Sequence, residues 1–184
     1  MLEIIKKVTV RDSKVFVNDS LFFQYSGEPD TTDFLKEFYR HLKPDYLKFF
    51  KMDNLSKLGF LSAEILLQEI DNKEDFGVIL STSSSSLDTD TAFQETIQDA
   101  DNFFPSPSVF VYTLPNIVIG EICIRHKIYG ENAMFIIHEN DTSDFYNLMD
   151  EMKVKQGIIG YLDCYKNHYQ AEFLLFRNKL TNKK

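Results

Sequence analysis

The sequence predicts an α/β fold in which helices pack on a mixed sheet of about five strands. Short apolar runs, typical of buried strands, alternate with segments of helical periodicity through the centre of the chain. Apolar residues make up 43% of the 184 residues, with 17 Phe and 9 Tyr, which is enough for a substantial core. We therefore expect one folded domain over residues 1–184.

The charge balance limits the kinds of partner to expect. The chain has 20 Lys and Arg against 28 Asp and Glu, a net charge of −8. This argues against nucleic acid or an anionic membrane surface as the main partner, and leaves a basic partner or simple solubility as explanations. No apolar stretch approaches the roughly 18–20 residues of a membrane span, and the first residues lack the pattern of a secretory signal.

The two cysteines, Cys123 and Cys164, are too few for a disulfide scaffold, and both lie in apolar surroundings. Buried thiols in a reducing compartment explain them. We therefore expect a cytoplasmic protein, and the sequence gives no reason to expect a cofactor.

A hairpin and a long helix are predicted in the first part of the chain. Residues 8–10 and 15–17 are apolar and flank a polar turn, as in two antiparallel strands. A helix begins at Asp53 or Asn54, either of which can cap it, and runs to about residue 68. Its leucines recur at steps of three and four residues, which is the spacing of one helical face.

A strand and a second helix follow. The apolar run 76–80 leads directly into the Ser-rich segment 81–86, the order of a buried strand that continues into a polar loop. This segment lacks the glycines and lysine of a phosphate-binding Walker motif, so we interpret it as a turn-forming loop. Residues 89–100 predict a helix capped by Thr89 or Asp90.

The next helix contains a glycine at its centre. Two prolines within residues 103–107 break the preceding helix, and Pro115 suits the first turn of a helix over 116–127. Gly120 costs a helix interior about 1 kcal/mol relative to Ala. We interpret it as a point of close packing against another element.

The last third of the chain predicts a strand, a helix and a strand pair. Gly130 precedes the apolar strand from Ala133 to His138. A helix over 142–155 follows, and Gly157 is expected to mark its end. Its many charged residues indicate that one side faces water or a polar partner. Two further strands are predicted at 158–165 and 171–177.

Four segments of the chain follow one another in an order that resembles the β-ketoacyl synthase family, in the N-terminal half of its thiolase-like fold. The resemblance covers residues 49–165 and is closest to the truncated branch that resembles chain length factors. The four segments are Phe49-Phe50-Lys51-Met52-Asp53, then Gly77-Val78-Ile79-Leu80-Ser81 with Thr89-Asp90-Thr91-Ala92-Phe93, then Ser106-Pro107-Ser108-Val109-Phe110 with Thr113-Leu114-Pro115-Asn116, and Gly130-Glu131-Asn132. The positions that match the family's motifs are Asp90, Phe110, Asn116, Gly120, Gly130 and Gly157.

The resemblance places Glu139 where the family keeps its nucleophilic cysteine. Counting from Gly130 without a gap leads to Glu139, and the glycine that closes the family's nucleophile helix then falls on Gly157. A carboxylate does not hold an acyl group as a stable thioester, so condensation through Glu139 is not expected. Two roles stay open for Glu139: a helix cap, worth about 0.3–1 kcal/mol, or a group that polarises or decarboxylates a bound acyl group.

The family's catalytic histidines and lysine belong to a C-terminal half that has no counterpart in this sequence. The four histidines, His41, His126, His138 and His168, do not match those motifs. His138 lies beside Glu139, but neighbouring strand residues point to opposite faces, so we expect no metal there.

The resemblance implies a non-catalytic ketosynthase-like subunit rather than an enzyme. It would associate with a full-length β-ketoacyl synthase as a heterodimer, or with a second copy of itself as a homodimer, in fatty-acid, polyene or polyketide-type synthesis. An acyl carrier protein is a further possible partner. The family dimerises through the strand before the nucleophile, here Ala133 to His138, whose bare edge needs cover. The alternatives are a small acyl-thioester decarboxylase or hydrolase with Glu139 as general base, and a stand-alone binding module.

Overall fold

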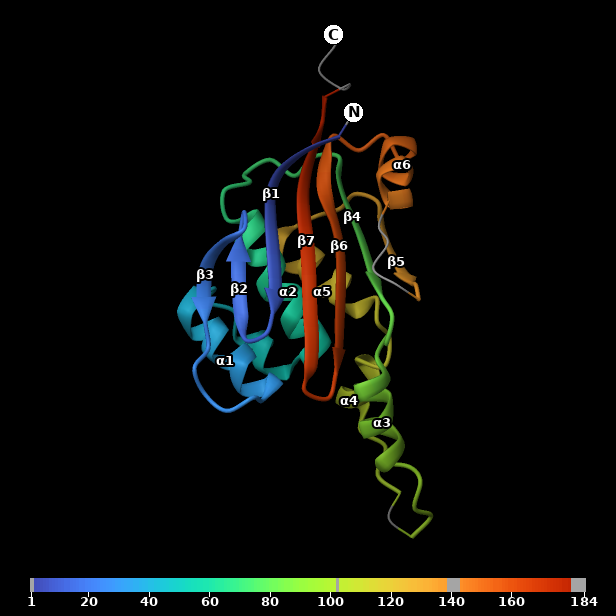
Figure 1. Ribbon diagram of the computed structural model, residues 1–184. Coiled ribbons are helices and arrows are strands. Elements are labelled where there is room, and N and C mark those ends of the chain that lie inside the picture. The colour runs from blue at the N-terminus through green and yellow to red at the C-terminus, as the bar shows by residue number, and fades with distance from the viewer. Residues whose placement is uncertain (1, 102, 139–142, 180–184) are drawn as a thin grey trace.

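The computed structural model describes residues 2–101, 103–138 and 143–179, in which a seven-stranded sheet carries helices on both faces (Figure 1). Along the sheet the order is β3-β2-β1-β7-β6-β4-β5. The strands are β1 (Leu2–Arg11), β2 (Lys14–Val17), β3 (Ser20–Gln24), β4 (Phe76–Thr82), β5 (Asn132–Ile136), β6 (Gln156–Tyr165) and β7 (His168–Asn178). The helices are α1 (Thr31–Leu42), the short 3₁₀ helix η1 (Leu47–Lys51), α2 (Asn54–Leu67), α3 (Leu87–Glu95), α4 (Pro107–Val111), α5 (Ile117–His126) and α6 (Ser143–Glu151).

The sheet is mixed, as the sequence predicts. β4 pairs in parallel with β5 and with β6, whereas β7 runs antiparallel to β6 and to β1. The α/β class is confirmed, but the expected number of about five strands is too low. The strand that sequence reasoning did not identify is β3, which is short and largely exposed, so it lacks the apolar alternation that identifies a strand.

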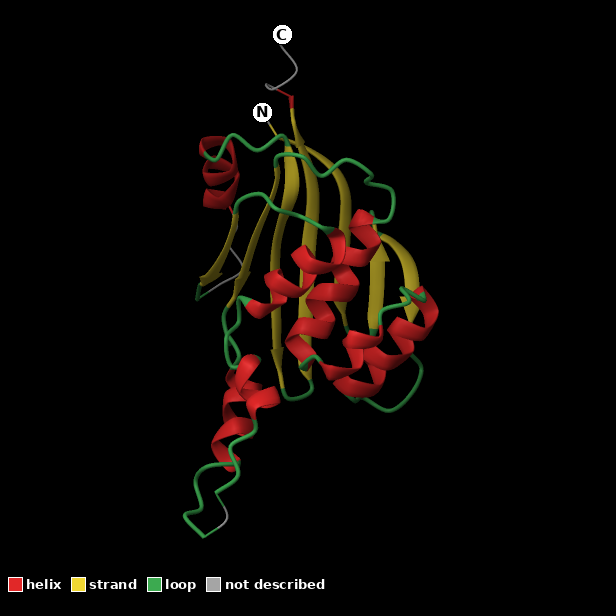
Figure 2. Ribbon diagram, turned by 180° about the vertical axis from the view of Figure 1, so that it is seen from behind, coloured by secondary structure: helices red, strands yellow, loops and turns green. Residues whose placement is uncertain are grey.

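Helices α1, α2 and α5 cover one face of the sheet (Figure 2). The main core lies between them and the sheet, and it includes Phe34 and Phe38 of α1, Phe60 of α2, and Phe173 of β7, all fully buried. Helix α1 was not predicted, although Asp30 caps it by accepting a hydrogen bond from the Asp33 amide. Burial of these aromatic rings, together with the aliphatic side chains of the same core, stabilises this layer.

Helix α6 lies on the opposite face and covers only part of it. Its buried residues Phe145 and Met149 pack with Ile79 of β4, Ile159 of β6 and Phe176 of β7. The rest of α6 is partly or fully exposed. This agrees with the prediction that one side of this helix faces water or a polar partner.

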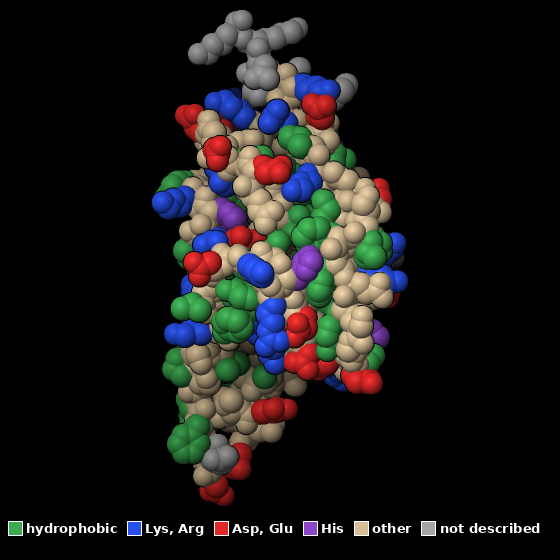
Figure 3. Space-filling view, turned by 90° about the vertical axis from the view of Figure 1, so that its left-hand side faces the viewer, with side chains coloured by type: hydrophobic (Ala, Val, Ile, Leu, Met, Phe, Trp, Pro, Cys, Tyr) green, Lys and Arg blue, Asp and Glu red, His purple; other side chains and the backbone are tan. Residues whose placement is uncertain are grey.

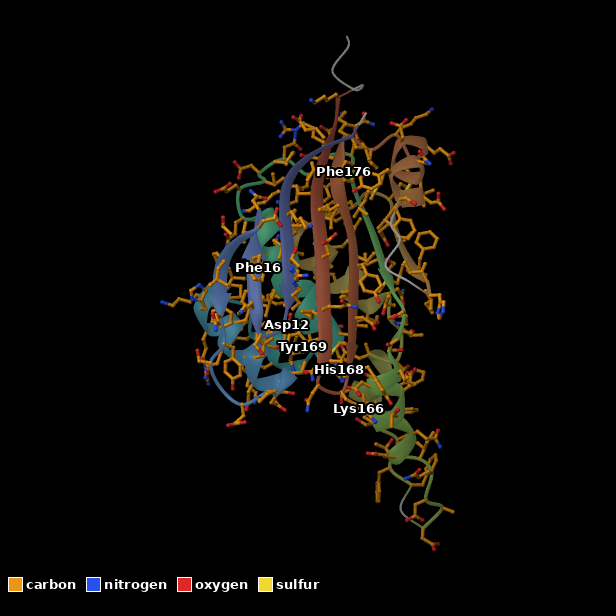
Figure 4. All side chains as sticks on the ribbon, in the orientation of Figure 1. Asp12, Phe16, Lys166, His168, Tyr169 and Phe176 are labelled. Atoms are coloured by element: carbon orange, nitrogen blue, oxygen red, sulfur yellow. The ribbon has the colours of Figure 1, made fainter. Side chains whose placement is uncertain are left out.

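Two tight turns lie side by side at one end of the sheet (Figure 4). Asp12 and Ser13 have φ values of 50° and 57°, the left-handed conformation that a two-residue hairpin turn requires. The Ser13 hydroxyl lies 3.2 Å from the hydroxyl of Tyr169, which follows the turn between β6 and β7. The hairpin of β1 and β2 and the pair of β6 and β7 are both present as predicted, but β1 begins at Leu2 and β7 at His168, earlier than expected.

Helix α3 differs from its prediction at both ends. It begins at Leu87 after Ser86 and ends at Glu95, so neither Thr89 nor Asp90 caps it and it does not reach residue 100. The Thr89 hydroxyl donates to Asp53 Oδ2 at 2.8 Å, so it is not available to cap a helix. Asp53 itself caps α2 as predicted, by accepting from the Ser56 amide at 2.9 Å.

Two glycines have roles that differ from the predicted ones. A Cβ at Gly120 would meet no atom within 4 Å, so close packing does not explain this residue. The close contact between α2 and α5 is instead at Gly59, where a Cβ would lie 2.4 Å from Val118 Cγ1. Gly157 does not end a helix: it lies in β6, and α6 ends at Glu151, before the predicted residue 155. The predicted start of this helix at residue 142 lies outside the described residues.

None of the helices in the described part of the chain is both long enough and apolar enough to cross a membrane.

Candidate functional site

The predicted nucleophile position, Glu139, lies outside the described residues. One of the two counts that led to it loses its structural support, because Gly157 belongs to β6 and not to the end of a helix. The other count begins at Gly130, which precedes β5 as expected. A Cβ at Gly130 would lie 2.2 Å from the Phe76 carbonyl oxygen, so only glycine fits this turn beside β4. The role of Glu139 stays a prediction.

The other motif positions do not converge on one cavity. Asp90 lies on α3, where its carboxylate accepts from the Ser86 hydroxyl at 3.2 Å. Phe110 lies on α4 and is 54% exposed, and Asn116 is exposed at the start of α5. None of these residues lines the cavity that the neighbouring elements form.

That cavity, of about 330 Å³, lies where the start of α2 meets α3, α4 and β6. Both apolar and polar side chains line it. The lining residues are Lys51, Met52, Asp53, Asn54, Leu55, Ser85, Ser86, Asp88, Thr89, Ala92, Ser108, Val109, Tyr112 and Cys164. Its size and mixed lining suit a small ligand or a protruding side chain of a partner.

One acidic group of the cavity, Asp53, has a structural role. Burial raises the pKa of Asp53 above its ordinary value, although hydrogen bonds from Ser56 and Thr89 oppose this effect. Both Asp53 oxygens already accept hydrogen bonds, one from the Ser56 amide and one from the Thr89 hydroxyl. Asp53 therefore ties α2 to α3 and shapes the cavity.

The cysteine of the cavity, Cys164, is not activated as a nucleophile. Burial raises the pKa of the Cys164 thiol to about 12, so the thiol stays protonated at neutral pH. Burial and the neighbouring carboxylate of Glu121 also raise the pKa of Tyr112, whose hydroxyl donates to Glu121 Oε1 at 3.2 Å. Within the described residues the cavity thus resembles a binding site more than a catalytic one.

The Ser-rich segment after β4 is bound by a carboxylate of the chain itself. Asp163 of β6 accepts hydrogen bonds from the amides of Ser83 and Ser84 and from the hydroxyls of Thr82, Ser83 and Ser84. Burial raises the pKa of Asp163, but the hydrogen bonds, first that of the Ser84 amide, outweigh it and hold the pKa below its ordinary value. The donors that would bind a phosphate are already used. The loop interpretation is confirmed, and a phosphate site there is not supported.

Sequence reasoning did not identify Asp163 as a functional residue. The one local signal is an aspartate inside an otherwise apolar strand, where a charged side chain requires hydrogen-bond donors. Metal ligands do not gather either: among the residues with described positions, no three His, Cys, Asp or Glu side chains form a group that suits a metal ion. His138 is exposed just beyond β5.

Comparison with solved structures finds matches to the whole fold. A chain in the complex of a ketosynthase with its chain length factor from Xenorhabdus doucetiae matches with a TM-score of 0.64 over 96% of this chain and 79% of that chain, at 12% identity. The chain has a ketosynthase-like fold. The ishigamide ketosynthase/chain length factor matches with a TM-score of 0.66 over 100% of this chain, at 14% identity.

The ketosynthase-like chain spans 64% of the matched ishigamide chain, which is therefore the longer of the two. No family model matches the sequence, and no curated protein matches it either. The fold resemblance predicted from the sequence motifs is thus confirmed by structure, at identities where sequence comparison finds nothing. Activity, substrate and partner do not follow from a likeness of this kind.

Proposed function

We propose that this chain is a non-catalytic, ketosynthase-like subunit that pairs with a full-length β-ketoacyl synthase through β5 and helps to hold the growing acyl chain. The observation that carries the proposal is the position of β5. Among the described residues it is the last strand of the sheet, paired on one side by β4.

The outer edge of β5 presents backbone groups that can bind another strand. The amide of Val78 donates to the carbonyl of Glu131, and the amide of Ile137 donates to the carbonyl of Thr82. In a parallel ladder the residues of one strand bond alternately to either side. The odd-numbered residues of β5 therefore face β4, and the backbone groups of Asn132, Met134 and Ile136 point to the outer edge.

The side chains of β5 fix the strand in place for such pairing. Phe135 stacks on Phe145 of α6, with ring centroids 5.0 Å apart, and Met134 packs against the main core on the other face. Ile136 is 65% exposed. An ordered edge strand with exposed apolar surface binds a partner strand without the entropy cost of ordering it first.

The chemistry of the described residues agrees with a subunit that does not catalyse condensation. Cys164 and Cys123 are the cysteines of the chain, and burial raises the pKa of each. Neither occupies position 139, where the motif count places the nucleophile. The matched structures include a ketosynthase in complex with its chain length factor, which supports pairing by analogy.

Co-purification tests this function. The tagged chain is co-expressed with each full-length ketosynthase encoded in the source genome, and the mass of the recovered complex is measured by light scattering after size exclusion. We expect a one-to-one complex with one of these ketosynthases. A chain that elutes alone as a monomer in every co-expression would contradict the proposal.

A further inference from the structure

A projecting pair of helices extends from the body of the molecule. We define the α3–α4 arm as α3 (Leu87–Glu95), residues 96–101 and 103–106, and α4 (Pro107–Val111) with the residues to Leu114. In Figures 1 and 2 the arm extends beyond the end of the sheet, from the side on which β4 and β5 lie. Its tip is therefore out of reach of the main core.

The arm exposes large apolar side chains. Phe104 is 75% exposed, Phe103 57% and Phe110 54%. On the same arm Leu114 is 52% exposed, Val111 46% and Leu87 45%. Single exposed apolar residues are ordinary on a protein surface, but six large ones on one projecting segment indicate an interaction surface.

Internal contacts hold the arm in a defined shape. The rings of Phe93 and Phe110 join α3 to α4 with centroids 5.3 Å apart. The Phe104 amide donates to the Thr96 carbonyl at 2.9 Å, and the Ser86 hydroxyl donates to the Thr113 carbonyl at the base. The arm is preorganised, which lowers the entropy cost of binding.

Charge indicates the chemistry of the partner. The sequence contains no Lys or Arg between Lys73 and Arg125. All the charged residues of the arm are acidic, namely Asp88, Asp90, Glu95, Asp99 and Asp101. Figure 3 shows the lower end of the molecule with acidic and apolar side chains and without basic ones. Such a surface suits an apolar groove with Lys and Arg at its rim.

We propose that the α3–α4 arm docks into an apolar groove with a basic rim on the ketosynthase that pairs at β5. This inference rests on the proposed function and adds a second contact with its own chemistry. The aromatic rings supply the affinity, and the carboxylates supply orientation and a dependence on salt. The arm extends from the side of the sheet that ends in β5, so one partner can contact both the arm and β5 (Figure 1).

The experiment measures the affinity of the chain for the co-purified ketosynthase by titration calorimetry, at low and at high salt. The double variant Phe103→Ser and Phe104→Ser removes the two most exposed aromatic rings of the arm and should weaken binding by about tenfold or more. The double variant Glu95→Gln and Asp99→Asn should weaken binding by about threefold at low salt and flatten the dependence on salt. The matched control is Leu21→Ser with Leu47→Ser, two exposed leucines outside the arm, which should bind like the wild type.

Each outcome distinguishes the two proposals. If the wild type binds a ketosynthase and the arm variants bind it as tightly as the control, with the same salt dependence, the arm proposal is wrong and the proposed function stands. If no ketosynthase binds, both are wrong. The chain is also examined alone by sedimentation: self-association that the Phe variant abolishes would show that a second copy covers the arm, and would overturn the assignment to a ketosynthase.

Discussion

The carboxylate of Asp163 binds Ser84 twice, since Oδ1 accepts from the Ser84 amide and Oδ2 from the Ser84 hydroxyl, each at 2.8 Å. Residues 79 positions apart in the sequence are thereby joined at the end of β4. The same carboxylate binds Thr82 and Ser83, so one charged group orders the start of the loop that leads into α3.

Removing this charge should weaken the fold. In Asp163→Asn an NH₂ group replaces one carboxylate oxygen. This NH₂ group faces hydrogen-bond donors, so the hydrogen bonds that the oxygen accepted are lost. We expect a loss of about 1–2 kcal/mol in the free energy of unfolding, at the lower end for charged hydrogen bonds because Asp163 is only partly buried. Urea denaturation followed by circular dichroism measures it. Asp19→Asn, in the exposed turn after β2, is the control and should change stability little.

The stabilisation by Asp163 should depend on pH. Because the pKa of the folded state lies below the ordinary value of 3.8, the contribution is complete well above that value and is lost as the pH falls through the folded-state pKa. The difference in stability between wild type and Asp163→Asn should therefore shrink from about pH 5 to about pH 3. The pKa of Asp53 is raised, but both proteins contain Asp53, so its contribution to the pH dependence cancels in the difference. A difference that grows on acidification would contradict the assigned direction.

Two glycine substitutions should have opposite effects. In Gly59→Ala the new methyl carbon would lie 2.4 Å from Val118 Cγ1, so α2 and α5 must separate or Val118 must move. We expect a loss of about 1–3 kcal/mol. In Gly120→Ala the methyl group meets no atom within 4 Å, so the gain in helix propensity should stabilise the fold by up to about 1 kcal/mol. Thermal melting of both variants measures this. Equal effects of the same sign would show that the glycines are not distinguished by packing.

The thiol of Cys164 should be unreactive while the chain is folded. Its pKa of about 12 leaves only a minute thiolate fraction at pH 8. That fraction is about one part in ten thousand. Ellman's reagent, used on Cys123→Ser to isolate Cys164, should react at once in urea and very slowly without it. Rapid reaction of the folded protein would mean that the cavity activates the thiol, and would count against a non-catalytic subunit.

The elements with strong local patterns could be predicted from the sequence. Helix α2 has a capping Asp53 and leucines at helical spacing, and β4 is a continuous apolar run, so both were correctly placed. Helix α1 and β3 were missed, the latter because its residues are mostly exposed and lack a periodic apolar pattern. The motif order also predicted the ketosynthase-like fold, and Gly130 is a motif residue that this fold requires, because a Cβ there would lie 2.2 Å from the Phe76 carbonyl oxygen.

The parts that depend on distant residues could not be predicted. Gly120 and Gly59 look alike in sequence, and only the path of α5 over α2 decides which one is a close contact. Thr89, predicted as a helix cap, instead binds Asp53, 36 positions earlier. The Ser-rich loop depends in the same way on Asp163 in β6. Local propensity carries no information about these pairs.

The most direct test of the central claim is the affinity of Ile136→Pro for the ketosynthase partner. The Ile136 amide points to the outer edge of β5, and its side chain is 65% exposed, so proline removes an outward donor without breaking the pairing with β4. Ile136→Ala keeps the amide and serves as the control.

We expect Ile136→Pro to melt like Ile136→Ala but to bind the ketosynthase at least about tenfold more weakly, whereas Ile136→Ala stays within about twofold of the wild type. A folded Ile136→Pro variant that pairs as tightly as Ile136→Ala would contradict pairing through β5.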